Sequence, residues 1–192
     1  MESKEQQWRI LQAECLNCTR CGLAPGRTNV VFGEGALDSR IMFVGEGPGQ
    51  QEDLQGRPFV GRAGQLLDKM LASIGLSRET NAMICNIVKC RPPDNRTPTM
   101  AEGEACLPWL RGQVAIVRPR ILVCLGATAV RHIIDPGAQI TKVRGQWFQR
   151  KGYSIAATYH PAALLRTPSR KVEAWEDLQG IMKKYTESCD EC

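Results

Sequence analysis

Four short apolar runs separated by helical patterns constrain the fold of this chain more than any other feature. The runs lie within SRIMFVGEG, NAMICNIVK, PRILVCLGA and YSIAATYHP, and none shows the strict alternation of a half-exposed strand. Helical patterns cover about residues 61–74, 99–117, 127–134 and 171–185. Strands that alternate with helices over short connections form a parallel sheet covered on both faces. We therefore expect an α/β fold, a three-layer α/β/α sandwich with a central four-stranded, mainly parallel sheet.

The chain length suits one domain with its own core. The chain has 192 residues, of which 43% are hydrophobic, and it shows no internal repeat or linker. No apolar run approaches the roughly 20 residues of a membrane span. The charged N-terminus, MESKEQQWRI, does not read as a signal peptide. We expect a single domain over residues 1–192, a monomer, located in the cytoplasm and without a membrane partner.

The charge is modestly basic. The net charge is +5, and basic residues gather in loop-like stretches such as KCRPPDNR and LLRTPSRK. This distribution suits an anionic partner such as nucleic acid, although the same excess of Lys and Arg is typical of an ordinary solvated surface.

Unusual polar residues follow three of the four expected strands. The exits GEGPG, NIVKC and YHPAA meet at one edge if the strands are parallel, and ligands bind at that edge. The glycines fit neither a Walker loop nor a dinucleotide fingerprint, but they indicate close approach of the backbone to something. Asn86 can donate and accept, His160 is one of two histidines, and Phe59 offers a stacking face. Each also has a structural interpretation, as a turn former, a loop histidine or a core aromatic.

Nine cysteines are the strongest anomaly of composition. In a cytoplasmic chain they favour metal or redox chemistry over structural disulfides. Cys85 and Cys124 lie inside apolar runs, where cysteine usually acts as a small core residue. The others are Cys15, Cys18, Cys21, Cys90, Cys106, Cys189 and Cys192. Two of these groups, CLNCTRC and CDEC, have the two-residue gap with which a pair of thiolates binds one metal or cluster.

Several motifs in a fixed order carry a family resemblance. They are GEGPGQQEDLQGRPFVGRAGQLLD, NIVKCRPPDNRTP, LGATA, ITKVRGQWF and TYHPAALLR. In this order they resemble the uracil-DNA glycosylase superfamily, and the chain is similar to its iron–sulfur-containing family 4 from about Cys18 to Leu178. The resemblance implies a monofunctional glycosylase that flips uracil out of DNA, hydrolyses the N-glycosidic bond and leaves an abasic site for base excision repair.

The resemblance also implies roles for the base-binding residues. The backbone around Gly47 would touch the uracil edge, and Glu46 would lie near the hydrolytic water and the sugar. Glu52 would crowd the C5 edge and reject the thymine methyl group. Phe59 would stack on uracil, and Asn86 would read its polar edge.

His160 matches the histidine that stabilises negative charge on the leaving base, and we expect it to be the catalytic donor. Glu46 is the second expected catalytic residue, with three roles open to it: general base, electrostatic stabiliser of the sugar cation, or structural anchor. The HPAALLR segment resembles a loop that wedges into the minor groove, while positive loops are expected to contact phosphates. The residues expected to contact DNA are therefore Arg91, Asn95, Arg96, Ala163, Leu164, Leu165 and Arg166.

A structural 4Fe-4S cluster is the cofactor that the resemblance implies. Its ligands would be Cys18, Cys21, Cys90 and Cys106, and an N-terminal segment of about residues 1–28 would help to bind it. Cys15 is an alternative ligand, because the spacing between Cys15 and Cys18 is the same as that between Cys18 and Cys21. Cys189 and Cys192 fall beyond the resemblance, in a tail of about residues 186–192 that we expect to be flexible.

Three other functions compete with this interpretation. A superfamily relative that traps uracil covalently would carry a histidine in a basic insertion, whereas His132 lies in the helical pattern ATAVRHII. A non-catalytic iron–sulfur module for DNA binding or redox chemistry would not need Asn86, Phe59 and His160 together. A nucleotide-binding fold without DNA chemistry is the third. Uracil-containing DNA, single- or double-stranded, is the expected partner, and no sequence motif assigns a replication clamp.

Overall fold

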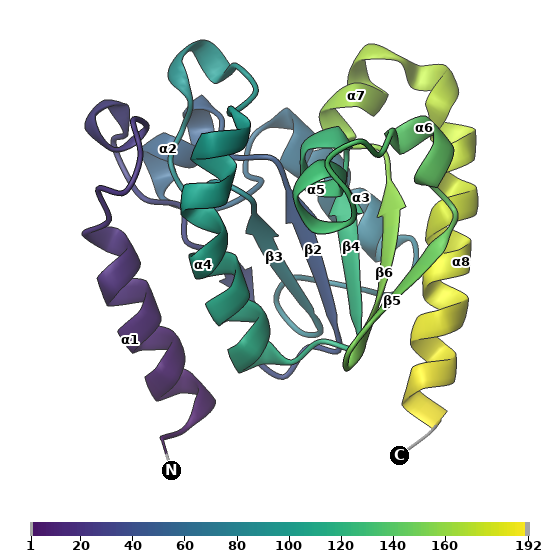
Figure 1. Cartoon of the computed structure of the whole chain (residues 1–192). Helices are drawn as coiled ribbons and strands as arrows, with labels where there is room; N and C mark the ends of the chain where they lie inside the picture. The colour runs from purple at the N-terminus through teal and green to yellow at the C-terminus, as the bar shows by residue number, and fades with distance from the viewer. Residues whose placement is uncertain (1, 191–192) are drawn as a thin grey trace.

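The computed structural model describes residues 2–190 as one six-stranded mixed sheet with helices on both faces (Figure 1). The strand order is β1-β3-β2-β4-β6-β5. The strands are β1 (Glu34–Gly35), β2 (Ile41–Gly45), β3 (Ala82–Asn86), β4 (Ile121–Leu125), β5 (Trp147–Arg150) and β6 (Tyr153–Thr158). The α/β class is confirmed, but the expected count of four strands is wrong.

The two strands missing from the sequence prediction lie at the edges of the sheet. The inner strands β3, β2, β4 and β6 pair in parallel, whereas β1 and β5 each pair antiparallel with a neighbour. β1 has only two residues, and β5 ends in two exposed residues. Neither edge strand has the continuous apolar run that marks a strand buried on both faces.

Eight α-helices occur within residues 2–190. They are α1 (Lys4–Leu16), α2 (Gln50–Gln55), α3 (Arg62–Ala72), α4 (Met100–Val117), α5 (Ala127–Ile133), α6 (Ile140–Val143), α7 (Pro161–Arg166) and α8 (Lys171–Asp190). The four helical patterns of the sequence correspond to α3, α4, α5 and α8. α8 continues to Asp190, through most of the segment expected to be a flexible tail, while Cys192 and the side chain of Cys189 lie outside the described part of the chain. None of the helices described is both long and apolar enough to cross a membrane.

Two apolar cores explain why the inner strands read as continuous hydrophobic runs. On one face, Met42, Met83 and Leu122 pack with residues of α1, α4 and α5. On the other face, Ile41 and Phe43 pack with residues of α3 and α8. Successive side chains of a strand point to opposite faces, so burial of both faces removes the polar alternation. In Figure 1 the inner strands point towards the end of the molecule that carries α2 and α7, and both termini lie at the opposite end.

The long helix α4 begins at a local signal that the sequence carries. The Thr99 side chain accepts a hydrogen bond from the Glu102 backbone N–H, and the Glu102 carboxylate accepts one from the Thr99 N–H. This reciprocal cap satisfies two amide groups that have no partner inside the helix. α1 begins with the same arrangement between Ser3 and Gln6, and it packs against α4.

Candidate active site

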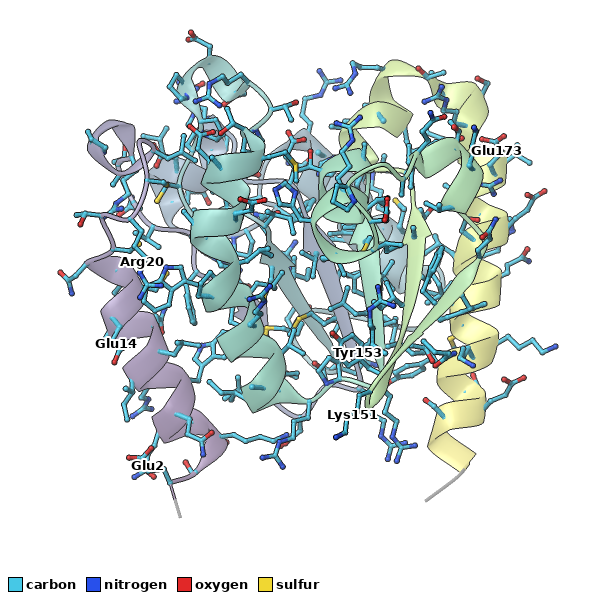
Figure 2. The ribbon with its side chains drawn as sticks, viewed as in Figure 1. Glu2, Glu14, Arg20, Lys151, Tyr153 and Glu173 are labelled. Atoms are coloured by element: carbon cyan, nitrogen blue, oxygen red, sulfur yellow. The ribbon has the colours of Figure 1, made fainter. Side chains whose placement is uncertain are left out.

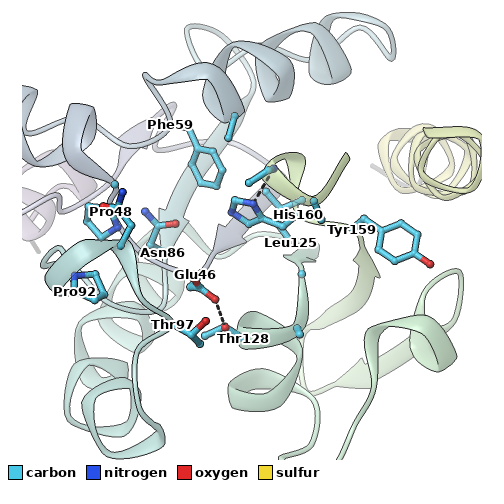
Figure 3. A pocket seen from close by; sticks show the side chains of 18 of the residues that line it. Glu46, Pro48, Phe59, Asn86, Pro92, Thr97, Leu125, Thr128, Tyr159 and His160 are labelled. Carbon is cyan, nitrogen blue, oxygen red and sulfur yellow. Dashed lines mark hydrogen bonds between the residues drawn. The ribbon is translucent and has the colours of Figure 1, made fainter. Parts of the chain in front are cut away.

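A pocket of about 640 Å³ lies at the carboxyl ends of the parallel strands (Figure 3). Each inner strand contributes a polar residue to its wall just after or at its last residue. These residues are Glu46 after β2, Asn86 at the end of β3, Thr128 after β4 and His160 after β6. The pocket therefore lies at the edge that the parallel topology indicates.

Two glycines let the loop after β2 approach its neighbours. A Cβ atom at Gly45 would overlap the Phe59 ring and the Asn86 carboxamide. A Cβ atom at Gly47 would overlap the side chain of Val88. We expected the backbone of this loop to approach something closely. Its close neighbours are side chains at the floor of the pocket and in the segment after β3.

Glu52 holds the loop in place through its carboxylate. Its Oε1 atom accepts hydrogen bonds from the backbone N–H groups of Val60 and Gly61, at 2.9 and 2.8 Å. Its Oε2 atom accepts one from the Gly49 N–H at 3.2 Å. Glu52 also lines the pocket, so one side chain both ties the loop together and forms part of the wall.

Phe59 is held in an unusual backbone conformation. Its φ angle is +53°, in the left-handed region that costs a bulky residue about 1–3 kcal/mol. The buried guanidinium of Arg78 stabilises this conformation by donating to the carbonyl oxygens of Pro58 and Phe59, at 2.7 and 2.8 Å. Asp68 pairs with Arg78 at 2.7 Å. Arg78 is a supporting residue that the sequence did not suggest, because only the fold brings it next to Phe59.

The Phe59 ring lies against the His160 imidazole at the pocket wall. The ring centroids are 5.5 Å apart, and the ring planes differ by 29°. Figure 3 shows both rings on the same side of the pocket. The two residues that the sequence singled out for stacking and charge stabilisation are therefore neighbours.

Asn86 carries a polar atom without a protein partner. The residue is only 2% exposed, and its Oδ1 atom has no hydrogen-bond partner among the described residues. A buried carbonyl oxygen without a partner is costly, which makes it a candidate for binding a ligand. Its side chain lines the pocket, as expected for a residue that reads a polar edge.

The local fold holds His160 in one neutral form. Its Nδ1 atom accepts a hydrogen bond from the Ala162 backbone N–H at 3.1 Å, so His160 caps the N-terminus of α7. Burial lowers the pKa of its imidazole to about 4, with a smaller contribution from the positive charge of Arg166. Because Nδ1 accepts, the single proton of the neutral ring is on Nε2, which can donate.

The carboxylate of Glu46 is oriented by Thr128. The Thr128 hydroxyl donates to Oε2 of Glu46, and Figure 3 shows this contact across the pocket. Thr128 is buried at the start of α5, within the LGATA segment that follows β4. LGATA is one of the motifs of the family resemblance, but the motif alone implied no role for Thr128. Its position at a strand exit was the available signal.

The residues of α7 that were expected to contact DNA differ in their exposure. Leu164 is 1% exposed and packs in the core, so its side chain does not face outward as the expected DNA contact would require. Leu165 is 38% exposed and Arg166 is exposed, so α7 offers the next two side chains instead. Ala163 lines the pocket.

The loop after β3 carries the remaining expected DNA contacts. Arg91 donates to Oδ1 of Asn95 at 2.8 Å. Arg96 forms a 2.7 Å ion pair with Glu102. Asn95 and Arg96 line the pocket and Arg91 does not, so the loop forms one side of the pocket entrance.

Five cysteines surround a second, smaller cavity between α1, α4 and the segment after β3. They are Cys15, Cys18, Cys21, Cys90 and Cys106. The cavity shares no lining residue with the pocket. Arg20, which also lines the cavity and is labelled beside the end of α1 in Figure 2, has its guanidinium 4.4 Å from the centroid of the Trp109 ring of α4. The cysteines proposed as ligands, and the alternative Cys15, therefore come together. Cys85 and Cys124 are fully buried in the core, as expected.

Three of the sulfur atoms at this cavity accept hydrogen bonds. The donors are Arg27 to Cys90 at 3.4 Å, the Lys89 backbone N–H to Cys106 at 3.3 Å, and the Trp109 indole to Cys18 at 3.3 Å. Such donors are typical around metal-bound thiolates.

Burial works against free thiolates at the same cavity. It raises the pKa of Cys106 to about 11 and that of Cys15 to about 12, and it raises the pKa of Cys90. These sulfurs need a positively charged centre to be thiolates at neutral pH. No group of three or more His, Cys, Asp or Glu side chains within the described residues is arranged to hold a single metal ion.

Comparison with known proteins relates this arrangement to one family. Residues 32–179 match the model of the uracil DNA glycosylase superfamily. The chain is 49% identical to a type-4 uracil-DNA glycosylase of Thermotoga maritima, over 90% of both chains. It is 43% identical to a type-4 uracil-DNA glycosylase of Sulfurisphaera tokodaii, over 92% of this chain and 86% of the relative. One from Archaeoglobus fulgidus is 42% identical, over 92% and 90%.

Proposed function

Because this chain belongs to the uracil DNA glycosylase superfamily, in its type-4 branch, we propose that it removes uracil from DNA by hydrolysing the N-glycosidic bond and leaves an abasic site. The observation that carries the proposal is the meeting of Phe59, His160 and the unpaired carboxamide oxygen of Asn86 in one pocket. These groups supply stacking, a neutral donor and a hydrogen-bond acceptor for one flipped base.

Base recognition rests on Asn86 and Phe59. Uracil presents an N3–H donor beside an O4 acceptor, and a carboxamide can bond both at once. The buried Oδ1 of Asn86 would accept from N3–H, which removes the cost of leaving that oxygen unpaired. Stacking of the base on Phe59 would add about 1–3 kcal/mol.

Glu52 would provide selection against thymine. Thymine differs from uracil by the methyl group at C5, and a wall that stands close to C5 excludes it. The three backbone hydrogen bonds of Glu52 fix the position of its side chain, so it cannot move aside at low cost.

Bond cleavage would use His160 as a neutral donor. As the glycosidic bond breaks, negative charge develops on the uracil oxygens and positive charge on the sugar. The Nε2–H of His160 would stabilise the leaving base without transferring its proton, since a neutral imidazole is a poor acid but a good hydrogen-bond donor.

Glu46 would act on the sugar side. We infer that its carboxylate stabilises the cationic sugar and orients the attacking water, with Thr128 fixing its rotamer. The water oxygen forms the new bond to the anomeric carbon, the bond to the base nitrogen breaks, and the water loses one proton to solvent, from which the released uracil anion takes up one proton. The electron pair of the broken bond leaves with the base.

We also propose a 4Fe-4S cluster held by Cys18, Cys21, Cys90 and Cys106. The sulfurs surround a cavity rather than one point, which suits a group of several atoms better than a single ion. When bound, such a cluster would join the N-terminal segment, the loop after β3 and α4. The N–H donors to three of the sulfurs support this assignment over a set of ordinary buried thiols.

DNA would bind across the pocket entrance. Leu165 is the exposed apolar side chain of α7, and it would replace Leu164 as the wedge that fills the space of the flipped base. Arg166 and the loop that holds Arg91 and Arg96 would contact phosphates on either side.

An oligonucleotide with one uracil tests the proposed function directly. After incubation, hot alkali cleaves the strand at an abasic site, and an otherwise identical oligonucleotide with thymine serves as the control. We expect cleavage of the uracil strand alone. Absence of cleavage by protein that contains its cluster would refute the proposal and favour a non-catalytic iron–sulfur DNA-binding module.

A further inference from the structure

A buried lysine connects the pocket to the cysteine cavity. Lys89 is 1% exposed and lies between Asn86 and Cys90 in the chain. Its Nζ atom donates to the backbone oxygen of Asn86 at 2.9 Å and to Oε1 of Gln113 at 2.7 Å. Its backbone N–H donates to the sulfur of Cys106 at 3.3 Å. One residue therefore contacts both sites.

Burial of the Lys89 ammonium group costs free energy, because the group loses its hydration. Both acceptors of its side chain are neutral, and no ion pair within the described residues includes it. An apolar side chain of similar length would fill the same space without the cost of desolvating an ammonium group. What lysine adds at this position is its N–H donors and a positive charge, and that charge acts to lower the pKa of Cys15 and Cys106 at the cavity that Lys89 lines.

Helix α4 supplies both of the fixed points that hold Lys89. Cys106 and Gln113 are seven residues apart, which places them on the same face of the helix. Gln113 is fully buried and is itself anchored, because its Nε2 atom donates to the Phe32 carbonyl at 2.7 Å. Lys89 thus lies along α4, bound by its backbone at one point and by its side chain at the other.

The segment that Lys89 anchors also supports the catalytic loop. The Ile87 N–H donates to the Gly45 carbonyl at 3.0 Å, and the Val88 N–H donates to the Glu46 carbonyl at 3.1 Å. A shift of Lys89 would move the end of β3 and, through these two hydrogen bonds, the loop that carries Glu46.

We propose that Lys89 is a positioning residue that couples the cysteine site to Asn86, so that the occupied site holds the carboxamide in the geometry for reading uracil. This inference rests on the function proposed above. The contact runs from Cys106 to the Lys89 backbone, and from the Lys89 side chain to the Asn86 backbone.

The variant Lys89→Met tests the coupling, with Lys183→Met as its control. Methionine keeps the length of the stem and removes the donors, while Lys183 is exposed and lies on α8. The measurement is the affinity for DNA with a non-hydrolysable 2′-fluoro uracil nucleotide, divided by the affinity for the thymine equivalent. We expect Lys89→Met to lower this ratio by about tenfold at the parent's iron content. Lys183→Met should leave the ratio unchanged.

An unchanged ratio in Lys89→Met with full iron content would overturn the proposal. If that variant does not fold or lacks iron, Gln113→Leu takes its place, since it removes one of the two side-chain acceptors of Lys89. The same fall in the ratio is expected there, and its absence would equally count against the coupling.

Hydrogen exchange tests the coupling without any uracil. In the parent protein, chelation of the iron should speed exchange of the Ile87 and Val88 amides, whereas in Lys89→Met these amides should already exchange fast before chelation. Parent amides that do not respond to chelation would refute the coupling. Because this measurement does not involve excision, a parent that fails to release uracil would refute the proposed function alone.

Discussion

His160 shows how burial of a single residue sets its chemistry. Its pKa is lowered to about 4 because burial disfavours the charged imidazole. An unfolded histidine titrates near 6.5, so the unfolded chain binds more protons between about pH 6.5 and 4. The contribution of His160 to stability therefore falls with decreasing pH across this window, by about 3 kcal/mol in all.

We predict that His160 stays neutral through the whole physiological pH range. The measurement is NMR of ring-labelled histidine, in which the two histidines of the chain give two sets of signals and His160→Gln removes one. The signal of His160 should not titrate above about pH 5. A midpoint near 6.5 would mean that the ring is not buried as described, and the neutral-donor role would be lost.

For a substitution of Asn86 we predict a loss of activity with little loss of stability. Asn86→Ala should lower kcat/KM for uracil by about 100-fold, because the base loses its polar partner. The Oδ1 atom makes no internal hydrogen bond, so the free energy of unfolding should change little. Excision kinetics and thermal unfolding of the same preparation check both parts. Activity equal to the parent's would remove Asn86 from base recognition.

At the scale of elements, Arg78 holds the turn between α2 and α3 that presents Phe59. Arg78→Met should destabilise the protein by about 2–3 kcal/mol, because two buried carbonyl oxygens lose a charged donor. It should also raise KM, since the left-handed conformation of Phe59 loses its support.

The matched control for Arg78→Met is Arg57→Met. Arg57 is exposed and pairs with Glu34 at 2.6 Å, so we expect a loss below about 1 kcal/mol and an unchanged KM. Chemical denaturation and steady-state kinetics measure both quantities. Equal effects of the two substitutions would contradict a specific role for Arg78.

At the scale of the whole molecule, the cysteine site joins segments that are far apart in the chain. Cys18→Ser should lose most of the iron and lower Tm by about 5 °C or more, because the N-terminal segment is released. Cys15→Ser should keep the iron, since Cys15 is not among the proposed ligands. Iron and sulfide content per chain, measured beside Tm, distinguishes the two. The reverse pattern would make Cys15 the ligand.

DNA affinity is also a property of the whole surface. With a net charge of +5 and basic residues on both sides of the pocket, binding should release counterions. We expect the affinity for uracil-free DNA to fall by about tenfold or more between about 50 and about 200 mM salt. Fluorescence anisotropy across this range measures the slope, and a flat response would place the phosphate contacts elsewhere.

The sequence predicted the elements whose signals are local. The inner strands are buried on both faces, so each reads as an apolar run, and the helical pattern over about residues 99–117 corresponds to α4. The order of strand exits was enough to bring Asn86 and His160 to one edge, because parallel strands share a carboxyl end. The ordered motifs indicated the family, which the comparisons confirm.

The tertiary structure alone decided the features that depend on contacts between distant segments. The edge strands β1 and β5 exist only as partners of inner strands, and Leu164 is buried because α7 turns it into the core while Leu165 faces outward. Arg78, Thr128 and Lys89 act through partners 19, 82 and 17 residues away, at Phe59, Glu46 and Cys106. Local sequence determines which elements form, whereas the packing of those elements determines which buried polar groups meet, because a partner so far along the chain leaves no local signal.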